Sequence, residues 1–228
     1  MEKTTELLKS IREMETGMKK NRILIIIPAY NEQDNILDTV RDLDQCGLEI
    51  DRIVVNDDSV DGTKKILEEY HICHINLPVN LGIGGGVQTG YLYAYENGYE
   101  IAVQMDGDGQ HCASELEKVV RPILNGEADV VVGSRFLEKE GFQSTQIRRV
   151  GINFLSFLGK LLTGVRVKDI TSGYRVVNTK FIRIFALDYP ADYPEPEAMV
   201  IAAVHGGRIK EYPMALSRIF LFCFAVMV

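Results

Sequence analysis

The feature that most constrains the fold of this chain is an alternation of short aliphatic runs with longer segments of mixed polarity. Most of the runs are near-continuous Ile and Val, and they predict strands at residues 22–27, 52–55, 72–75, 101–105 and 129–132. Such strands are typical of a parallel sheet that is covered on both faces. The sequence therefore predicts an α/β fold with a mostly parallel central sheet and helices on both faces.

Helices are predicted between these runs. Residues 36–43 carry apolar side chains at helical spacing, and Asn31 is the predicted N-cap of this segment. A glycine-rich loop at 81–86 is expected to open a helix that runs to about residue 97. Further helices are expected at residues 61–70, at residues 114–125 and in the segment that begins with Glu195.

Composition limits the possible partners and location. With 228 residues, 46% of them hydrophobic, the chain can bury a sizeable core in one domain or in one domain plus an appendage. The formal net charge of -7 and the pI of about 5.2 argue against a nucleic-acid partner. The four cysteines show no paired metal spacing, and no signal peptide is recognisable, so we expect a cytoplasmic location.

Two carboxylates directly follow one aliphatic run, in the segment Asp106-Gly-Asp108-Gly-Gln110. In an extended strand Asp106 and Asp108 would point the same way, because side chains alternate with period two. Together with the amide oxygen of Gln110 they offer hard oxygen ligands suited to Mg²⁺ or Mn²⁺. A polar turn is the alternative, since Asp and Gly are common in turns; the neighbouring clusters favour the metal.

Polar clusters also follow two other predicted strands, at Tyr30-Asn31-Glu32 and at Asp57-Asp58-Ser59. Ligands of open α/β sheets bind beyond the carboxyl ends of the strands. Three acidic clusters at this edge therefore predict a ligand site. A dehydrogenase is disfavoured, because the first strand is not followed by the Gly-x-Gly-x-x-Gly turn that binds a dinucleotide.

Six motifs occur together and in order: Pro28-Ala-Tyr-Asn-Glu32, Val55-Asn-Asp57-Asp-Ser59 with Asp61-Gly-Thr63, Asn80-Leu-Gly82, Asp106-Gly-Asp108-Gly-Gln110-His111, Gly133-Ser-Arg135 and Thr171-Ser-Gly-Tyr-Arg175. This set closely resembles glycosyltransferase family 2, with the GT-A fold, in the branch of dolichol-phosphate mannosyltransferase-like and bacterial cell-surface polysaccharide enzymes. The resemblance covers residues 21–213. It leaves residues 1–20 as an N-terminal extension and residues 214–228 as a helical or apolar C-terminal tail.

The resemblance implies a role for individual residues. The residues expected to bind the nucleotide are Pro28, Tyr30, Glu32, Asn56, Asp57 and Asp106. Those expected to hold the cation are Asp106, Asp108 and Gln110. Those expected to meet phosphate charge near the acceptor are Arg135, one of Arg148 or Arg149, and Arg175. Glu197 would act as a base for a sugar hydroxyl, which makes Asp108, Arg135 and Glu197 the expected catalytic residues. The alternative for Glu197 is equally good, because acids favour the first turn of a helix.

Two departures from the family pattern stand out. Asn56-Asp57-Asp58-Ser59 replaces the usual Asp-Asp-Gly-Ser, so a turn that needs a positive φ would be strained at Asp58, although Asp tolerates that conformation better than most residues. After Pro213 the chain departs from the basic loop and interfacial helix that relatives usually carry. The acceptor side is therefore expected to be altered.

The resemblance implies a metal-dependent, inverting glycosyltransferase that moves a sugar from a nucleotide-diphosphate sugar to a polyprenyl-phosphate or glycan acceptor. The altered C-terminus leaves an alternative open, a nucleotide-sugar-binding pseudoenzyme or truncated regulatory subunit. Peripheral contact with the cytoplasmic face of a membrane is expected at the helix 146–162 or the tail 219–228, with packing on the sheet as the alternative. The tail is too short to span a bilayer, which takes roughly 20 apolar residues.

Overall fold

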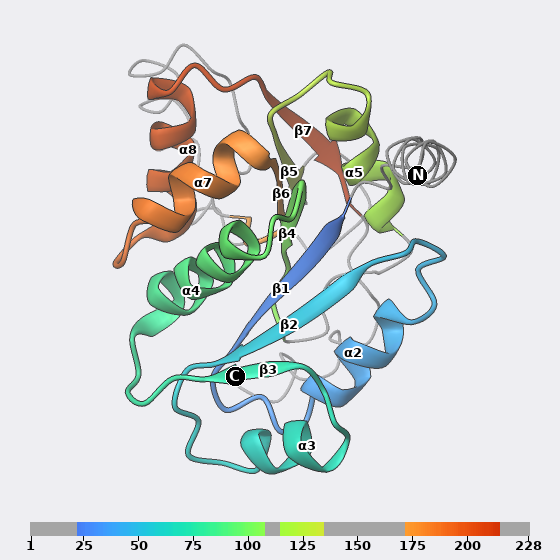
Figure 1. The fold of residues 1–228 in the computed structure, drawn as a ribbon, viewed down its shortest axis with the longest axis vertical. Helices are drawn as coiled ribbons and strands as arrows, with labels where there is room; N and C mark the ends of the chain where they lie inside the picture. Colours follow the sequence, from blue (N-terminus) through green and yellow to red (C-terminus); the bar gives the residue numbers. More distant parts are fainter. Residues whose placement is uncertain (1–21, 108–114, 135–171, 215–228) are drawn as a thin grey trace, which may run out of the picture.

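The computed structural model describes residues 22–107, 115–134 and 172–214 (Figure 1). Their strands form one seven-stranded sheet, in the order β3-β2-β1-β4-β6-β5-β7. The strands are β1 (Ile23–Ala29), β2 (Asp51–Asn56), β3 (His74–Asn76), β4 (Ile101–Gln104), β5 (Val130–Ser134), β6 (Arg175–Asn178) and β7 (Ile209–Pro213). The helices are α2 (Ile36–Leu43), α3 (Thr63–Glu69), α4 (Gly82–Glu96), α5 (Leu116–Leu124), α7 (Thr179–Leu187) and α8 (Pro194–Val204).

The predicted α/β fold with a mostly parallel sheet is confirmed. Strand β1 pairs in parallel with β2 and β4, β2 with β3, and β5 with β7. Strand β6, which the sequence analysis did not predict, runs antiparallel to both β4 and β5. Because β6 is reversed, its first residue lies at the carboxyl edge of the parallel strands, where Arg175 pairs with Gln104 and Val132.

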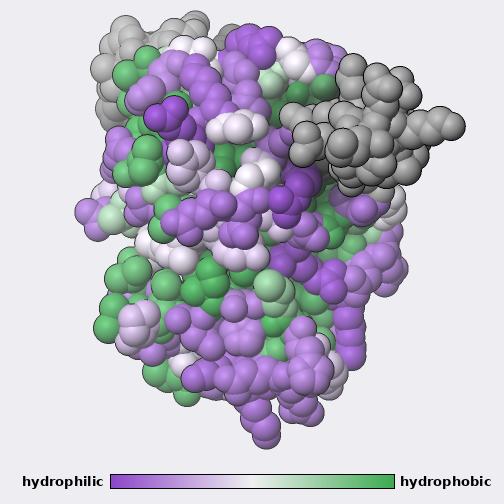
Figure 2. Space-filling model, in the orientation of Figure 1, coloured by the Kyte–Doolittle hydropathy of each residue, from purple (hydrophilic) through white to green (hydrophobic). Residues whose placement is uncertain are grey.

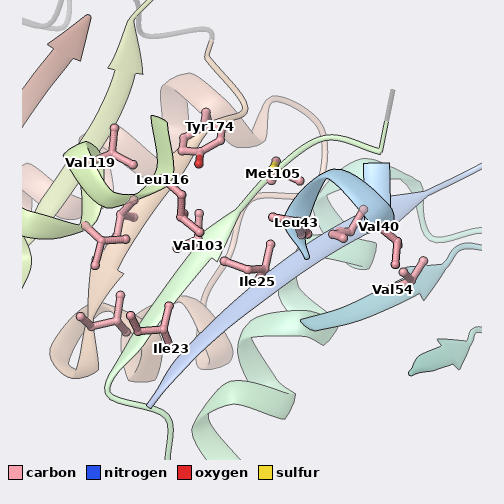
Figure 3. Close-up of a cluster of buried hydrophobic side chains, with 14 of the residues drawn as sticks. Ile23, Ile25, Val40, Leu43, Val54, Val103, Met105, Leu116, Val119 and Tyr174 are labelled. Carbon is pink, nitrogen blue, oxygen red and sulfur yellow. The ribbon is translucent and has the colours of Figure 1, made fainter. Parts of the chain in front are cut away.

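Helices cover both faces of the sheet, as predicted (Figure 1). Alternate residues of β1 and β4 face the two sides, because side chains of a strand alternate. Ile25 and Val103 pack on one side with α2 and α5, represented by Leu43 and Leu116 in Figure 3. The opposite face packs on α4, α7 and α8, through the buried residues Leu24, Ile26, Ala102, Tyr91, Phe181, Phe185 and Ala198.

Three local predictions need correction. The first strand extends through Pro28 to Ala29 instead of stopping at Ile27. Proline is tolerated there because the pairing of β1 with β4 ends at Ile26, so Pro28 has no ladder hydrogen bond to donate on that side. Helix α2 begins at Ile36 after Asn35, whereas Asn31, the predicted N-cap, adopts a left-handed conformation with φ 58° in the preceding loop.

The glycine run at 82–86 lies within α4 and not in a loop before it. Close packing accounts for Gly84 in this run and for Gly90 further along the helix. A Cβ at Gly84 would lie 2.6 Å from the Ala191 carbonyl oxygen, and a Cβ at Gly90 would overlap the side chain of Ile26 on β1. The loss of helix propensity is therefore offset by the close approach of α4 to the sheet and to the segment before α8.

The proposed boundaries at residues 20 and 213 stay predictions. The N-terminal extension, the segment 146–162 that was predicted to be helical, and the tail 219–228 lie outside the described residues. Met214, assigned from sequence to the tail, is buried, and its amide donates to the Ser134 carbonyl over 3.0 Å. Within residues 22–107, 115–134 and 172–214, no helix is both long enough and apolar enough to cross a membrane.

The face of the molecule seen in Figure 2 is dominated by hydrophilic residues, which small hydrophobic patches interrupt. Exposed apolar side chains on or beside α4 include Leu81, Ile83, Leu92 and Tyr95. Apolar residues scattered in this way are ordinary on a protein surface.

Candidate active site

The carboxyl edge of the sheet brings the predicted polar clusters together. The loop after β1 and the loop after β2 are joined by hydrogen bonds: the Asn31 amide donates to Ser59 Oγ over 3.0 Å, and the Glu32 amide donates to Thr63 Oγ1 over 2.8 Å. Asn31 Oδ1 accepts in turn from the Val60 amide at 2.9 Å. The two loops therefore form one interlocked support beside the end of β4.

Asp57 is almost fully buried at this edge, with 4% of its surface exposed. Its Oδ1 accepts the Leu81 amide over 2.7 Å, and its carbonyl accepts from Asn80 Nδ2 over 3.2 Å. The start of α4 is thus fastened to the end of β2 by neutral donors. Within the described residues Asp57 makes no ion pair and its Oδ2 makes no hydrogen bond, so this oxygen remains for a ligand.

Both polar atoms of the Asn56 side-chain amide form hydrogen bonds within the protein. Nδ2 donates to Asn76 Oδ1 over 2.7 Å, and Oδ1 accepts the Ser59 amide over 3.2 Å. A carboxylate could not donate to Asn76, which accounts for Asn where the family pattern has Asp. Asp58 adopts φ 57°, so the turn does need the left-handed conformation that was anticipated there, and the exposed Asp58 tolerates it.

Among the other residues assigned to the nucleotide, Pro28 is buried in β1, Tyr30 is 49% exposed, and Glu32 is partly buried. Glu32 Oε2 accepts from Asn35 Nδ2 over 3.1 Å. The exposed ring of Tyr30 lies just beyond the end of β1 and gives this edge an aromatic surface.

Asp106 lies two residues beyond the end of β4 and is partly exposed. The backbone of Gly173 lies directly on its carboxylate, because a Cβ at Gly173 would lie 2.6 Å from Asp106 Oδ1. The next residue, Gly107, packs closely on β1, because a Cβ there would meet the Pro28 carbonyl oxygen at 3.2 Å. Its own carbonyl accepts from Thr39 Oγ1 of α2 over 3.0 Å, so the turn after β4 is anchored from two sides.

Of the three predicted metal ligands, the structure describes only Asp106. Asp108 and Gln110 lie outside the described residues, as do Arg135, Arg148 and Arg149. The part of the chain that the structure describes holds no group of three or more His, Cys, Asp or Glu residues arranged to hold a metal ion. The position of Asp106 at the ligand-binding edge and the all-oxygen donor set suit a hard divalent cation.

Arg175, assigned from sequence to phosphate, is fully buried beneath this edge. Nη1 donates to the Tyr189 hydroxyl over 3.2 Å, and Nη2 donates to the Glu195 carbonyl over 2.9 Å. The Tyr189 hydroxyl in turn donates to Gln104 Oε1 over 3.0 Å. Burial raises the pKa of Tyr189 to about 12, so its hydroxyl keeps the proton that it donates.

Glu195 and Glu197 open α8, as predicted, after Pro194 in the first turn. Glu197 is exposed, whereas Glu195 is partly buried. Sequence reasoning missed Gln104, Tyr189 and Thr39 as parts of the site. Gln104 did carry a signal, because it is the one polar residue in the run Ile101-Ala-Val-Gln-Met105.

A mostly parallel sheet of this order, covered by helices on both faces, is a GT-A-like fold. Glucosyl-3-phosphoglycerate synthase of M. tuberculosis shares the fold, with a TM-score of 0.69 and 20% identity over 90% of this chain and 76% of that chain. That protein has also been crystallised with Mn²⁺, UDP-glucose and phosphoglyceric acid. A fragment of S. aureus TarS matches with a TM-score of 0.60 and 18% identity, and the chain spans 58% of that fragment.

The chain belongs to glycosyl transferase family 2, whose model matches residues 24–185, and it is a glycosyltransferase. It is 34% identical over 217 residues to the UDP-N-acetylglucosamine–dolichyl-phosphate N-acetylglucosaminyltransferase of Methanococcus voltae. The match covers 86% of both chains. The resemblance predicted from the motifs is therefore confirmed.

Proposed function

We propose that this glycosyltransferase moves a sugar from a nucleoside-diphosphate sugar to a polyprenyl phosphate, in a metal-dependent and inverting reaction. The observation that carries the choice of acceptor is the match to the dolichyl-phosphate enzyme of Methanococcus voltae, which extends over most of both chains. The geometry of the edge supports the assignment of the donor, because Asp57 and Asp106 follow β2 and β4, the two strands that flank β1 in parallel.

The nucleotide is assigned to the interlocked loops after β1 and β2. Oδ2 of Asp57 can accept an N–H of the base or a hydroxyl of the ribose, because its partner oxygen is already engaged by Leu81. Tyr30 offers an exposed ring for the base, while Pro28 and Glu32 complete this side. Asn56 supports the turn through Asn76 and Ser59 and so shapes the nucleotide site from beneath.

The diphosphate is assigned to Asp106, Asp108 and Gln110, which would hold Mg²⁺ or Mn²⁺. When bound, such a cation stabilises the negative charge that collects on a departing nucleoside diphosphate. The bare backbone of Gly173 keeps Asp106 in place without occupying the space in front of it. Arg135 is assigned to the same phosphate charge, since a guanidinium suits bidentate contact with phosphate oxygens.

The acceptor oxygen would attack the anomeric carbon from the side opposite the diphosphate. A new C–O bond forms as the bond to the diphosphate breaks, and the electron pair leaves with the nucleoside diphosphate, so the configuration inverts. A phosphate acceptor is already ionised and releases no proton. If a sugar hydroxyl were the acceptor, the exposed Glu197 would take its proton.

A lipid-linked acceptor must be met at a bilayer surface. Arg148 and Arg149 stand near the start of an amphipathic segment, and basic residues beside an apolar face favour anionic headgroups. We assign acceptor phosphate to one of these arginines and peripheral membrane contact to the segments 146–162 and 219–228.

The test is transfer from radiolabelled UDP-N-acetylglucosamine, UDP-glucose or a GDP-sugar to dolichyl phosphate or undecaprenyl phosphate in detergent micelles. The enzyme is first stripped with EDTA and then assayed with and without Mn²⁺. We expect a lipid-extractable product with one donor and only with added Mn²⁺. Transfer to a glycan hydroxyl but not to lipid phosphate would overturn the acceptor assignment, and donor binding without any transfer would favour the pseudoenzyme.

A further inference from the structure

A chain of buried hydrogen bonds connects the two sides of the proposed site. It runs from Gln104 at the end of β4, through the hydroxyl of Tyr189 and the guanidinium of Arg175, to the carbonyl of Glu195 in the first turn of α8. Gln104 stands two residues before Asp106, and Glu195 stands two residues before Glu197. These hydrogen bonds therefore link the end of β4, beside Asp106, to the first turn of α8, which carries Glu197.

This arrangement is costly for stability alone. Arg175 and Gln104 are both fully buried, and Tyr189 is 6% exposed. In the described part of the molecule Arg175 forms no ion pair, and its Nε has no hydrogen-bond partner. An apolar side chain of similar volume usually stabilises a core as well as a buried charge does. The guanidinium is therefore better explained by what it holds in place.

Strand pairing and aromatic packing hold these hydrogen-bonded side chains in place. Arg175 and Gln104 are directly paired across β6 and β4, so their spacing is set by the sheet. The ring of Tyr189 packs on Phe185 at 5.3 Å and on Tyr91 at 5.5 Å between centroids. These contacts fix the hydroxyl of Tyr189 from the side opposite the sheet.

The first turn of α8 has no side-chain cap, because its N-cap residue, Tyr193, makes no side-chain capping hydrogen bond. The bond from Arg175 Nη2 to the Glu195 carbonyl therefore fixes the backbone of the first turn, where Glu197 is also found.

We propose that Arg175 and Tyr189 are positioning residues, which hold the first turn of α8, and with it Glu197, at a set distance from the Asp106 end of β4. The proposal rests on the proposed function, which places the nucleotide-sugar donor at the Asp106 end. Glu197, at the other end, is the base that a sugar-hydroxyl acceptor would need. Neither residue touches the substrate. Each acts through the hydrogen bonds that it makes below the site.

Electrostatics agree with this placement. Burial raises the pKa of Tyr189 to about 12, the charge of Arg175 opposes that rise, and the carboxylates of Glu195 and Asp106 add to it. Charges at both ends of the site therefore affect the pKa of Tyr189, and its hydroxyl stays protonated and able to donate to Gln104 at physiological pH.

The test compares Tyr189→Phe with Tyr99→Phe in the transfer assay. Tyr189→Phe removes both hydrogen bonds of the hydroxyl and keeps the ring. Tyr99→Phe removes a similar hydrogen bond, 2.8 Å long, to Asp51 at the opposite edge of the sheet. Because a displacement of about 1 Å can lower a rate on the order of 10²-fold, we expect a fall of that size in kcat for Tyr189→Phe, with KM for the nucleotide sugar unchanged. Tyr99→Phe should leave both constants unchanged.

Two arginine variants give an independent readout. Arg175→Lys keeps the charge and can reach one of the two acceptors, so it should recover part of the kcat that Arg175→Met loses. Equal rates for Lys and Met, or a rise in donor KM with kcat unchanged, would overturn the positioning role. If Tyr189→Phe does not fold, Gln104→Met removes the acceptor of the same hydrogen bond and takes its place.

Hydrogen–deuterium exchange separates this proposal from the proposed function. If the wild type transfers no sugar, the proposed function fails, and exchange at the first turn of α8 still decides the positioning role. Tyr189→Phe should speed exchange of the amides at residues 197–199 and leave α4 residues 92–96 unchanged. Unchanged exchange at 197–199 would overturn the proposal whatever the activity.

Discussion

The two edges of the sheet hold their carboxylates in different ways. At the amino edge, Asp129 forms an ion pair: it accepts hydrogen bonds from Nε and Nη2 of Arg208, each over 2.9 Å, and a third from Nδ2 of Asn178 over 2.9 Å. At the carboxyl edge, Asp57 is held by the neutral amide of Leu81 and makes no ion pair in the described residues. Cation-paired carboxylates fasten strands together, whereas a carboxylate held by neutral donors keeps its charge for a ligand.

The carboxylate at the amino edge stabilises the fold, whereas the carboxylates at the carboxyl edge are placed to bind a ligand. Asp129 precedes β5 and Arg208 precedes β7, so their contact joins two parallel strands at their starts. Asp57 and Asp106 stand beyond the ends of β2 and β4, where no further strand remains to be joined. Substitutions at the carboxyl edge should therefore change binding more than stability, and substitutions at the amino edge should do the reverse.

The largest effect is expected for Asp106→Asn. Removing one carboxylate charge from a divalent cation site should lower metal-dependent transfer on the order of 10²–10³-fold, because few ligands share the charge of the cation. Melting temperature should change little, since Asp106 is partly exposed. The matched control is Asp58→Asn, an equal change of charge at an exposed residue whose positive φ Asn also tolerates. Equal activities for the two variants would contradict the comparison.

Gly173→Ala should act on the same carboxylate without changing any charge. The added Cβ would overlap the Asp106 carboxylate, which can only move away. Because misplacing a supporting group of a metal ligand typically lowers metal affinity about 10–100-fold, we expect a loss of that size in Mn²⁺-dependent donor binding, measured by titration calorimetry. Gly86→Ala is the control, since a Cβ there would meet only Pro28 Cβ, at 3.8 Å. A loss of binding in both variants would point to a general disturbance of the fold.

Asp57→Asn should give a smaller loss. Its Oδ1 can still accept the Leu81 amide, while Oδ2 becomes a donor where the nucleotide needs an acceptor. One such mismatched hydrogen bond costs a few kcal/mol at most, so we expect donor affinity to fall about tenfold with little change in melting temperature. Unchanged affinity for UDP and for a GDP-sugar would show that the nucleotide does not meet Asp57.

At the amino edge, Asp129→Asn should change stability alone. The hydrogen bonds from Arg208 hold the pKa of Asp129 at about 2, below its usual 3.8. A depressed pKa adds stability above the unfolded value, and that stability is lost as the pH falls from about 4 towards 2. We expect a melting temperature about 2–6 °C lower at pH 7, with the difference from wild type shrinking in acid, and unchanged donor affinity. A loss of donor affinity in Asp129→Asn would show that the amino edge also contributes to donor binding, contrary to this prediction.

The carboxyl edge could be predicted from sequence because its residues directly follow aliphatic strands. Because the carboxyl ends of parallel strands lie at one edge of the sheet, this is enough to place Asp57 and Asp106 at the same edge. The amino edge could not be predicted in this way. Asp129 and Arg208 are 79 residues apart, and nothing local to either marks the pair.

Strand β6 was missed for a related reason. Its four residues, Arg175 to Asn178, are too few to show a period, and their antiparallel pairing with β4 joins Arg175 to Gln104 far back in the chain. The same pairing explains why Arg175 is buried beneath the edge, where it donates to Tyr189 and to the Glu195 carbonyl of α8; its assignment to phosphate stays a prediction. The glycines of α4 were placed in a loop because their helix propensity is low, and tertiary packing overrides that preference.

The central claim is that a divalent cation and a nucleoside diphosphate bind together at the carboxyl edge. The most direct measurement is a crystal structure grown with UDP-glucose, or with the donor that the transfer assay selects, and MnCl₂, with diffraction recorded at the manganese absorption edge. We expect one anomalous peak about 2.0–2.3 Å from a carboxylate oxygen of Asp106, with the diphosphate on the same ion and the base near Asp57. A bound nucleotide with no manganese at Asp106, or with the ion elsewhere on the molecule, would contradict it.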